Sequence, residues 1–249
     1  MAKNYETGHV KNVENFIRLQ ECITSFGTRY APGDARLKLP NVETIKQNSL
    51  DAISAVNMAI PPYLQAISRR ENAFTGIPQL ASRVLLLAET LNIDKATTNA
   101  VKELVRKLYG RRATPKRNTE TPTEGENTPI QEHKNISVSQ LSFDQRISHF
   151  NQIIILLDAE TAYQPAETDL SIAGLTTRLT EMQTSNNLVT QTSIPPVTAR
   201  STRNTVLYTP ITGLVDVAMS IKKYIRAAFG PDSGEYKRVK ELKFTKIKV

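Results

Sequence analysis

The 249-residue chain has no tryptophan, one cysteine and three histidines, and its ten glycines are scattered. The single thiol, Cys22, cannot form an internal disulfide, and its neighbours Leu19, Ile23 and Phe26 predict a buried, inert side chain on a helix face. No glycine-rich phosphate loop and no G-x-S-x-G elbow occurs in the sequence. The motifs of the common nucleotide-binding and serine-hydrolase sites are therefore missing.

The three histidines do not suggest a metal site. We expect His9 to precede the first helix, His133 to lie in a linker, and His149 to lie on a helix surface. None of these positions places a histidine in a rigid site among other ligands. We therefore predict no catalytic residue, no metal and no cofactor, and hence a protein that is not an enzyme.

Long hydrophobic runs are also missing. The longest covers residues 153–157, which is far too short to cross a bilayer, and the N-terminus has no continuous apolar stretch. The sequence thus predicts no membrane span and no secretory signal, and we expect a cytoplasmic location.

Positive charge is in excess and is concentrated at one end. The formal net charge is +8, and residues 222–249 carry 9 basic against 3 acidic side chains. Such a balance permits a nucleic acid or another acidic partner without requiring one.

The chain repeats itself at a spacing of 134 residues. The stretch "AIPPYLQAISRRENAFTGIPQL" from Ala59 aligns without gaps with "SIPPVTARSTRNTVLYTPITGL" from Ser193. The apolar residues Phe16, Leu19 and Ile23 recur as Phe150, Ile153 and Leu157, and after a slip of one residue "YAPGDARLKLPNV" recurs as "YQPAETDLSIAGL". This correspondence predicts an internal duplication.

Apolar residues recur every three or four positions in both halves, as on one face of an amphipathic helix. We predict an all-α fold, an internally duplicated antiparallel helical bundle with about three to four helices in each half. The predicted boundaries are a first repeat at 1–110, a Pro/Thr/Glu/Asn-rich linker at 111–140, a second repeat at 141–230 and a basic C-terminal tail at 231–249. The two repeats can form separate bundles or one larger body.

Three features leave alternatives open. The proline pairs at 61–62 and 195–196 either kink a long second helix or close it and open a third. The segment "KFTKIKV" alternates as an edge strand does, although we expect a frayed tail instead. The first half ends in one helix or a helix pair, with Asp94 as an N-cap and Gly110 as a stop.

The function that these features favour is a non-enzymatic structural or protein-interaction module, for which self-association is one form of contact. We expect its contacts on the polar second helix of the repeat and on the basic tail. In the second copy Tyr63, Leu64 and Ile67 are replaced by the smaller or more polar Val197, Thr198 and Ser201. One alternative is a small-ligand carrier or enzyme with a site between the bundles. Another is a nucleic-acid-binding protein that uses the basic segments 106–117 and 237–248. The residues that would contact nucleic acid or an acidic partner are Arg106, Lys107, Arg111, Arg112, Lys116, Arg117, Lys237, Arg238, Lys240, Lys243, Lys246 and Lys248.

Overall fold

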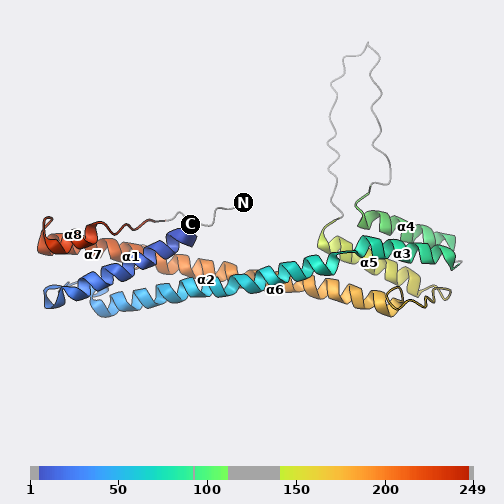
Figure 1. The fold of residues 1–249 in the computed structure, drawn as a ribbon, viewed down its shortest axis with the longest axis horizontal. Coiled ribbons are helices and arrows are strands. Elements are labelled where there is room, and N and C mark those ends of the chain that lie inside the picture. The colour runs from blue at the N-terminus through green and yellow to red at the C-terminus, as the bar shows by residue number, and fades with distance from the viewer. Residues whose placement is uncertain (1–5, 92, 112–140, 247–249) are drawn as a thin grey trace, which may run out of the picture. The chain divides into compact units, whose positions relative to one another are not determined.

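A computed structural model of the protein describes residues 6–91, 93–111 and 141–246, and within these ranges it contains helices and no β-strand (Figure 1). The α-helices are α1 (Glu6–Ser25), α2 (Leu39–Phe74), α3 (Ile77–Thr90), α4 (Lys95–Leu108), α5 (Phe143–Asp158), α6 (Ile172–Tyr208), α7 (Leu214–Phe229) and α8 (Gly234–Lys240). Two short 3-10 helices, η1 (Gly27–Arg29) and η2 (Ala35–Leu37), lie between α1 and α2. The prediction of an all-α fold is confirmed.

The chain forms two compact units. Unit 1 comprises Met1–Gln65 and Gln191–Val249, and unit 2 comprises Ala66–Thr190. The long helices α2 and α6 each contribute residues to both units. Each unit therefore draws helices from both of the predicted halves, 1–110 and 141–230, whereas nearly all of the predicted linker lies outside the described residues.

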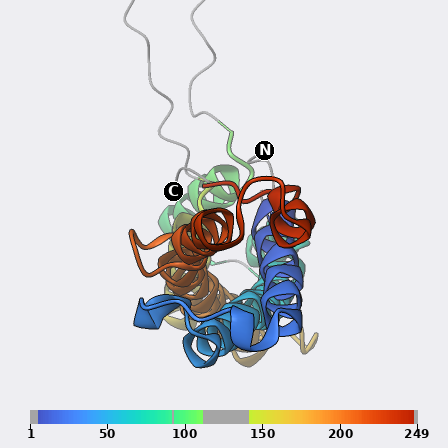
Figure 2. The same ribbon diagram turned by 90° about the vertical axis from the view of Figure 1, so that its left-hand side faces the viewer.

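In unit 1, α1 packs against α7 and α8, and α7 also contacts η2 (Figure 2). Their buried faces supply the apolar core, with the N-terminal part of α2 and the last turns of α6. The largest fully buried side chains of this core are Phe16, Leu19, Ile23, Leu207 and Leu214.

In unit 2, α4 packs against both α3 and α5, and the end of α2 and the start of α6 complete the core. Its largest fully buried side chains are Ile77, Leu108, Phe150, Ile153, Leu157, Leu175 and Met182. The rings of Phe74 and Phe143 meet edge to face with centroids 4.8 Å apart, and the guanidinium of Arg70 lies 3.9 Å from the centroid of Phe143. Aromatic and cation–π contacts thus join α2 to α5.

Local sequence explains several helix ends. The Asp94 carboxylate accepts hydrogen bonds from the backbone N–H groups of Ala96 and Thr97, as predicted, and so caps α4. The Ser142 and Ser233 hydroxyls cap α5 and α8 in the same way. The first half ends in the helix pair α3 and α4, and Gly110 follows α4 with a positive φ of 68°.

Both long helices continue through their proline pairs. Pro61 and Pro62 lie inside α2, and Pro195 and Pro196 lie inside α6. The alternative in which each pair closes one helix and opens another is therefore wrong. A proline inside a helix removes one backbone hydrogen-bond donor, and its ring crowds the carbonyl group four residues earlier. In spite of this, both helices continue on either side of their proline pairs.

The two loops that follow α1 and α5 contain the same hydrogen bond. The buried hydroxyl of Tyr30 donates to the carbonyl oxygen of Leu37 at 2.8 Å, and that of Tyr163 donates to Leu170 at 2.8 Å. Burial raises the pKa of both phenols, that of Tyr163 to about 12, with nearby Asp169 and Glu167 adding to the effect. Each loop is closed by a neutral tyrosine that bonds seven residues ahead.

Two histidine predictions are wrong. His9 lies within α1 and is buried, not ahead of the first helix. His149 is also buried, since it lies one turn before Ile153 at the edge of the apolar face of α5. His133 lies outside the described residues.

Candidate interaction surfaces

The predicted basic residues fall into two groups that belong to different units. Arg106, Lys107 and Arg111 belong to unit 2, at and just after the end of α4. Lys237, Arg238, Lys240, Lys243 and Lys246 belong to unit 1, in α8 and the segment that follows it. The remaining predicted contacts, Arg112, Lys116, Arg117 and Lys248, lie outside the described residues.

Part of the unit 2 group is held by neighbours in the chain. The Arg106 guanidinium donates to the Glu103 carboxylate at 2.6 Å and to the carbonyl oxygen of Arg111 at 2.6 Å. The Arg111 guanidinium lies 4.8 Å from the ring centroid of Tyr109. These contacts and the position of Arg106 and Lys107 in the last helical turn fit the ordinary role of cations at a helix C-terminus.

The C-terminal segment is bound along unit 1 as an extended peptide, so the expectation of a frayed tail is wrong as far as Lys246, and the strand alternative is not observed in the described residues. The Asn12 side chain pairs with the main chain of Thr245 in both directions: its Nδ2 donates to the carbonyl oxygen at 2.9 Å, and its Oδ1 accepts from the N–H at 3.0 Å. Asn15 donates to the carbonyl oxygen of Lys243 at 2.8 Å. Side chains of α1 thus take the place of a neighbouring strand.

From the other side, α7 holds the same segment. The Lys222 ammonium donates to the carbonyl oxygens of Lys240 at 2.9 Å and Leu242 at 2.7 Å, and burial lowers its pKa. Lys246 pairs with Asp216 at 2.7 Å, and this hydrogen bond is the main cause that holds the pKa of Asp216 below its usual value. Three members of the predicted basic tail, Lys240, Lys243 and Lys246, therefore take part in holding the segment in place.

A buried polar network lies beside this segment. The Nδ1 of His9 and the hydroxyl of Tyr208 are joined by a hydrogen bond of 2.6 Å, and Asn12 also donates to this hydroxyl at 3.3 Å. His9 and Asn12 are buried, and Arg203 on α6 is buried as well, with its guanidinium bonded to Asn204. The network ties α1 to the end of α6 within unit 1.

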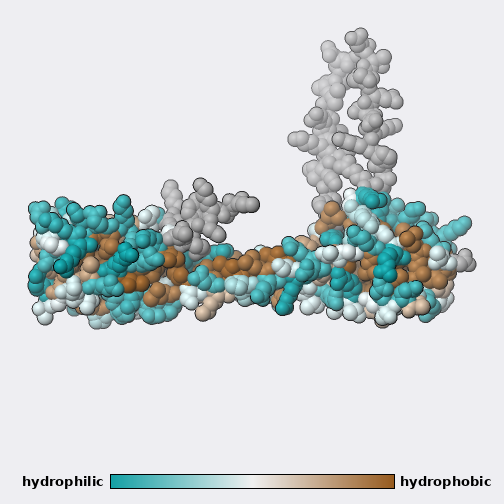
Figure 3. Space-filling model, viewed as in Figure 1, coloured by the Kyte–Doolittle hydropathy of each residue, from teal (hydrophilic) through white to brown (hydrophobic). Residues whose placement is uncertain are grey.

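Large apolar side chains are exposed on α2 and α6 around the proline pairs. In unit 1, the exposed fractions are 73% for Met58, 55% for Leu64, 62% for Ile194 and 65% for Val197. Pro61, Pro62 and Pro195 are exposed next to them. We call these seven residues the proline surface, and Figure 3 shows the hydrophobic colour along the parts of α2 and α6 that carry it.

The seven residues of the proline surface lie in two stretches of the sequence that have no charged side chain. Between Asp51 and Arg69 the chain has 17 consecutive residues without a charged side chain, and between Glu181 and Arg200 it has 18. These uncharged stretches cover the middle of each long helix. They can be read from the sequence, but they contain no catalytic, metal-binding or basic motif. Helix surfaces that face water usually carry charged residues, so the proline surface stands apart from the rest of both helices.

No protein-family model, curated protein or solved structure matches the chain. Within the described residues, no helix is long and apolar enough to span a membrane. The same ranges contain no group of three or more His, Cys, Asp or Glu side chains placed to hold a metal ion.

Proposed function

We propose that the protein is a non-enzymatic interaction module that associates with a second copy of itself through the proline surface. The observation that carries this proposal is the exposure of Met58, Leu64, Ile194 and Val197 by more than half within one compact unit. Exposed apolar side chains gathered on one part of a protein are a common mark of an interaction site.

The chemistry of the surface favours a second copy as the partner. A two-fold interface brings the same patch of two chains together, and a charged patch would then meet its own charge. The proline surface limits that repulsion because all seven of its residues lie in the uncharged stretches 52–68 and 182–199, and the charged residue nearest to it in the sequence is Arg200, one turn after Val197. Burying an exposed Val or Ile side chain contributes roughly 1.5–3 kcal/mol, so four such side chains supply a substantial driving force.

Internal duplication, with the boundaries predicted from the sequence, is part of the same proposal. Three features support it: long helices of 36 and 37 residues, a proline pair inside each, and the matching Tyr30–Leu37 and Tyr163–Leu170 hydrogen bonds. Duplication gives one chain two similar helices to present, and the replacement of Leu64 by Thr198 makes the two helices differ.

The two alternative functions remain predictions. Nucleic-acid binding through segments 106–117 and 237–248 requires an affinity that falls steeply with added salt in a filter-binding assay, and no binding at low salt removes it. A carrier or enzyme site requires a ligand that binds saturably.

Light scattering over a micromolar concentration series tests the proposed association. We expect the mean mass to rise with concentration for the natural sequence. Val197→Lys would place a charge in the interface, and we expect it to raise the dissociation constant by at least about tenfold, because burying an unpaired charge costs well above 1.4 kcal/mol.

The matched control is Leu86→Lys, since Leu86 is 62% exposed but lies on α3 in unit 2. It should associate as the natural sequence does. A mass that stays at one chain over the whole series contradicts the proposal, and so does an equal effect of both variants.

A further inference from the structure

A surface groove of about 420 Å³ lies between α4 and α5 in unit 2. It is lined by Ala100, Glu103, Leu104, Lys107, Gln152, Ile155 and Leu156. Its volume falls at the lower end of the range of small-molecule sites, which is roughly 300–1,000 Å³. The groove is separate from the proline surface, which belongs to unit 1.

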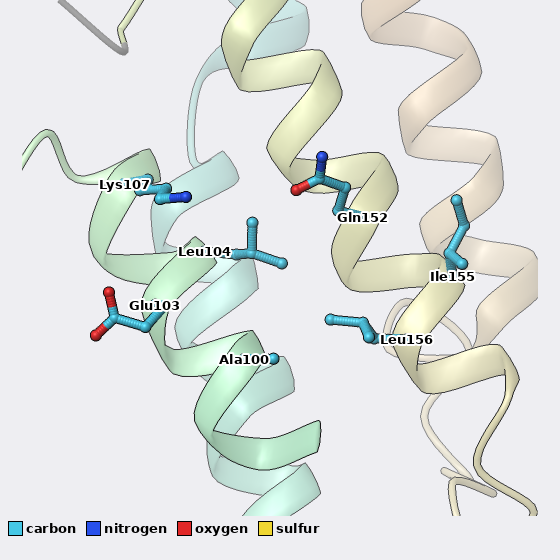
Figure 4. Close-up of a pocket in the computed structure, with 7 residues that line it drawn as sticks. All are labelled: Ala100, Glu103, Leu104, Lys107, Gln152, Ile155 and Leu156. Carbon is cyan, nitrogen blue, oxygen red and sulfur yellow. The ribbon is translucent and has the colours of Figure 1, made fainter. Parts of the chain in front are cut away.

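The groove has an apolar wall on each side. Figure 4 shows Leu104 of α4 and Leu156 of α5 turned toward one another across it. Ile155 also lines the groove and is 59% exposed, which is costly for a side chain of this size unless something covers it. Ala100 and Lys107 are seven residues apart on α4, so the groove extends for about 10 Å along the helix at a rise of 1.5 Å per residue.

The polar groups lie together at the end of the groove nearest the C-terminus of α4. The Lys107 ammonium and the Gln152 amide both point into the space between the helices (Figure 4). The Lys107 ammonium forms no ion pair or hydrogen bond with any described residue. The one acidic residue of the lining, Glu103, turns its carboxylate away and pairs with Arg106 at 2.6 Å.

His149 lies one turn before Gln152 on α5, at the same end. It is buried, and neither ring nitrogen has a hydrogen-bond partner among the described residues. Burial, and secondly the charge of Lys107, lower the pKa of this imidazole. An anion beside the Lys107 ammonium would offset that charge.

From this arrangement we infer that the α4–α5 groove binds a medium-chain aliphatic carboxylate, with the carboxylate at Lys107 and Gln152 and the alkyl chain along Leu104, Ile155 and Leu156. An amphiphile of this class matches the groove in three respects: one unpaired cation, one neutral hydrogen-bond donor and an apolar floor about as long as its tail. The carboxylate receives a charge-assisted hydrogen bond from Lys107, and the tail covers the exposed Ile155.

Isothermal titration with octanoate tests the inference on the full chain. We expect saturable binding of one octanoate per chain that weakens with added salt. Lys107→Gln keeps most of the side-chain length but removes the charge, and it should weaken binding at least tenfold. The matched control is Lys102→Gln, an exposed lysine of the same helix outside the groove lining, and it should leave binding unchanged.

Two further measurements distinguish binding at the proposed site from non-specific hydrophobic binding. Octanamide, which has the same tail without the charge, should bind at least tenfold more weakly than octanoate. Histidine NMR should show that octanoate raises the pKa of His149 in the natural sequence and not in Lys107→Gln. Absence of saturable binding, an equal loss in Lys102→Gln, or equal affinity for octanamide overturns the inference. None of these readouts depends on self-association, so the outcome is independent of the proposed function.

Discussion

The two compact units differ in the polar side chains that lie in their interiors. In unit 1 the buried polar residues His9, Asn12, Asn15, Ser49 and Arg203 accompany the apolar core, whereas in unit 2 the buried imidazole of His149 has no hydrogen-bond partner among the described residues. In unit 1 the amides of α1 bind the C-terminal segment, and a histidine is bonded to Tyr208. A satisfied polar group inside a protein specifies one arrangement of the chain, while an unsatisfied one is a cost. In unit 1, buried polar side chains therefore hold the C-terminal segment in place. In unit 2, the buried imidazole of His149 lies beside the α4–α5 groove without a hydrogen-bond partner among the described residues.

The largest effects should come from the apolar cores, because each core contains a fully buried phenylalanine. Phe16 in the core of unit 1 and Phe150 in the core of unit 2 are both fully buried. Phe16→Ala and Phe150→Ala should each lower the free energy of unfolding by about 3–5 kcal/mol, measured by urea denaturation. A loss below about 1 kcal/mol for one of them would mean that the two cores differ in packing as well as in polarity.

A substitution of Asn12 should disrupt the polar network of unit 1 most strongly. Asn12→Ala removes both hydrogen bonds to the main chain of Thr245 and one to Tyr208, so we expect a loss of about 1–3 kcal/mol. Hydrogen exchange at the Thr245 amide should become faster. Asn15→Ala, which removes one bond to Lys243, is the milder companion, and unchanged exchange in Asn12→Ala would refute the account of the tail.

The matching tyrosine loops provide a comparison in which the units should agree. Tyr30→Phe and Tyr163→Phe each remove one buried hydrogen bond, and each should cost about 1 kcal/mol in thermal or urea unfolding. Since the folded pKa of Tyr163, about 12, lies above the unfolded value of roughly 10, the stability it contributes is complete below pH ~10 and is lost as the pH rises through the folded pKa. Tyr163→Phe should be less sensitive to alkaline unfolding than the natural sequence, and equal sensitivity would contradict this assignment.

The two buried histidines should give changes of opposite sign. His149→Leu removes an unpartnered buried imidazole and should stabilise the protein by up to about 1 kcal/mol, whereas His9→Leu removes a partner of Tyr208 and should destabilise it by about 1–2 kcal/mol. Because the folded pKa of His149 is lowered, the natural sequence loses stability as the pH falls below its unfolded value of about 6.5. In His149→Leu, the free energy of unfolding should therefore fall less as the pH is lowered. If both leucine variants destabilise the protein, the proposed difference between the two units, a buried histidine with a partner in unit 1 and one without a partner in unit 2, is contradicted.

Much of the fold follows from local patterns in the sequence. The apolar spacing along Phe16, Leu19 and Ile23 predicts a helix with a buried face, and the Asp94 cap is visible as a residue type at a helix start. The docking of Thr245 on Asn12 is not visible in this way, because it joins residues 233 positions apart through a side-chain amide. Helical periodicity also places a residue only approximately at the edge of an apolar face, which is why His149 was expected on the surface.

The candidate surfaces were harder to predict than the fold. Catalytic and basic motifs consist largely of charged residues, but a charged side chain such as Lys246 can be paired within the chain, here with Asp216. The proline surface is marked instead by missing charge over the middle of two helices, and its exposure depends on which turns the rest of each unit covers. Lys107 was expected to contact an acidic partner, but only the packing of α4 on α5 places it beside an apolar groove.

The most direct test of self-association through the proline surface is the rate of thiol alkylation at Val197→Cys, in a chain where Cys22→Ala removes the natural thiol. As the protein concentration rises through the micromolar range, we expect the rate at position 197 to fall several-fold, while the rate at Leu86→Cys in the same background stays constant. A rate at position 197 that does not change with concentration would contradict the central claim.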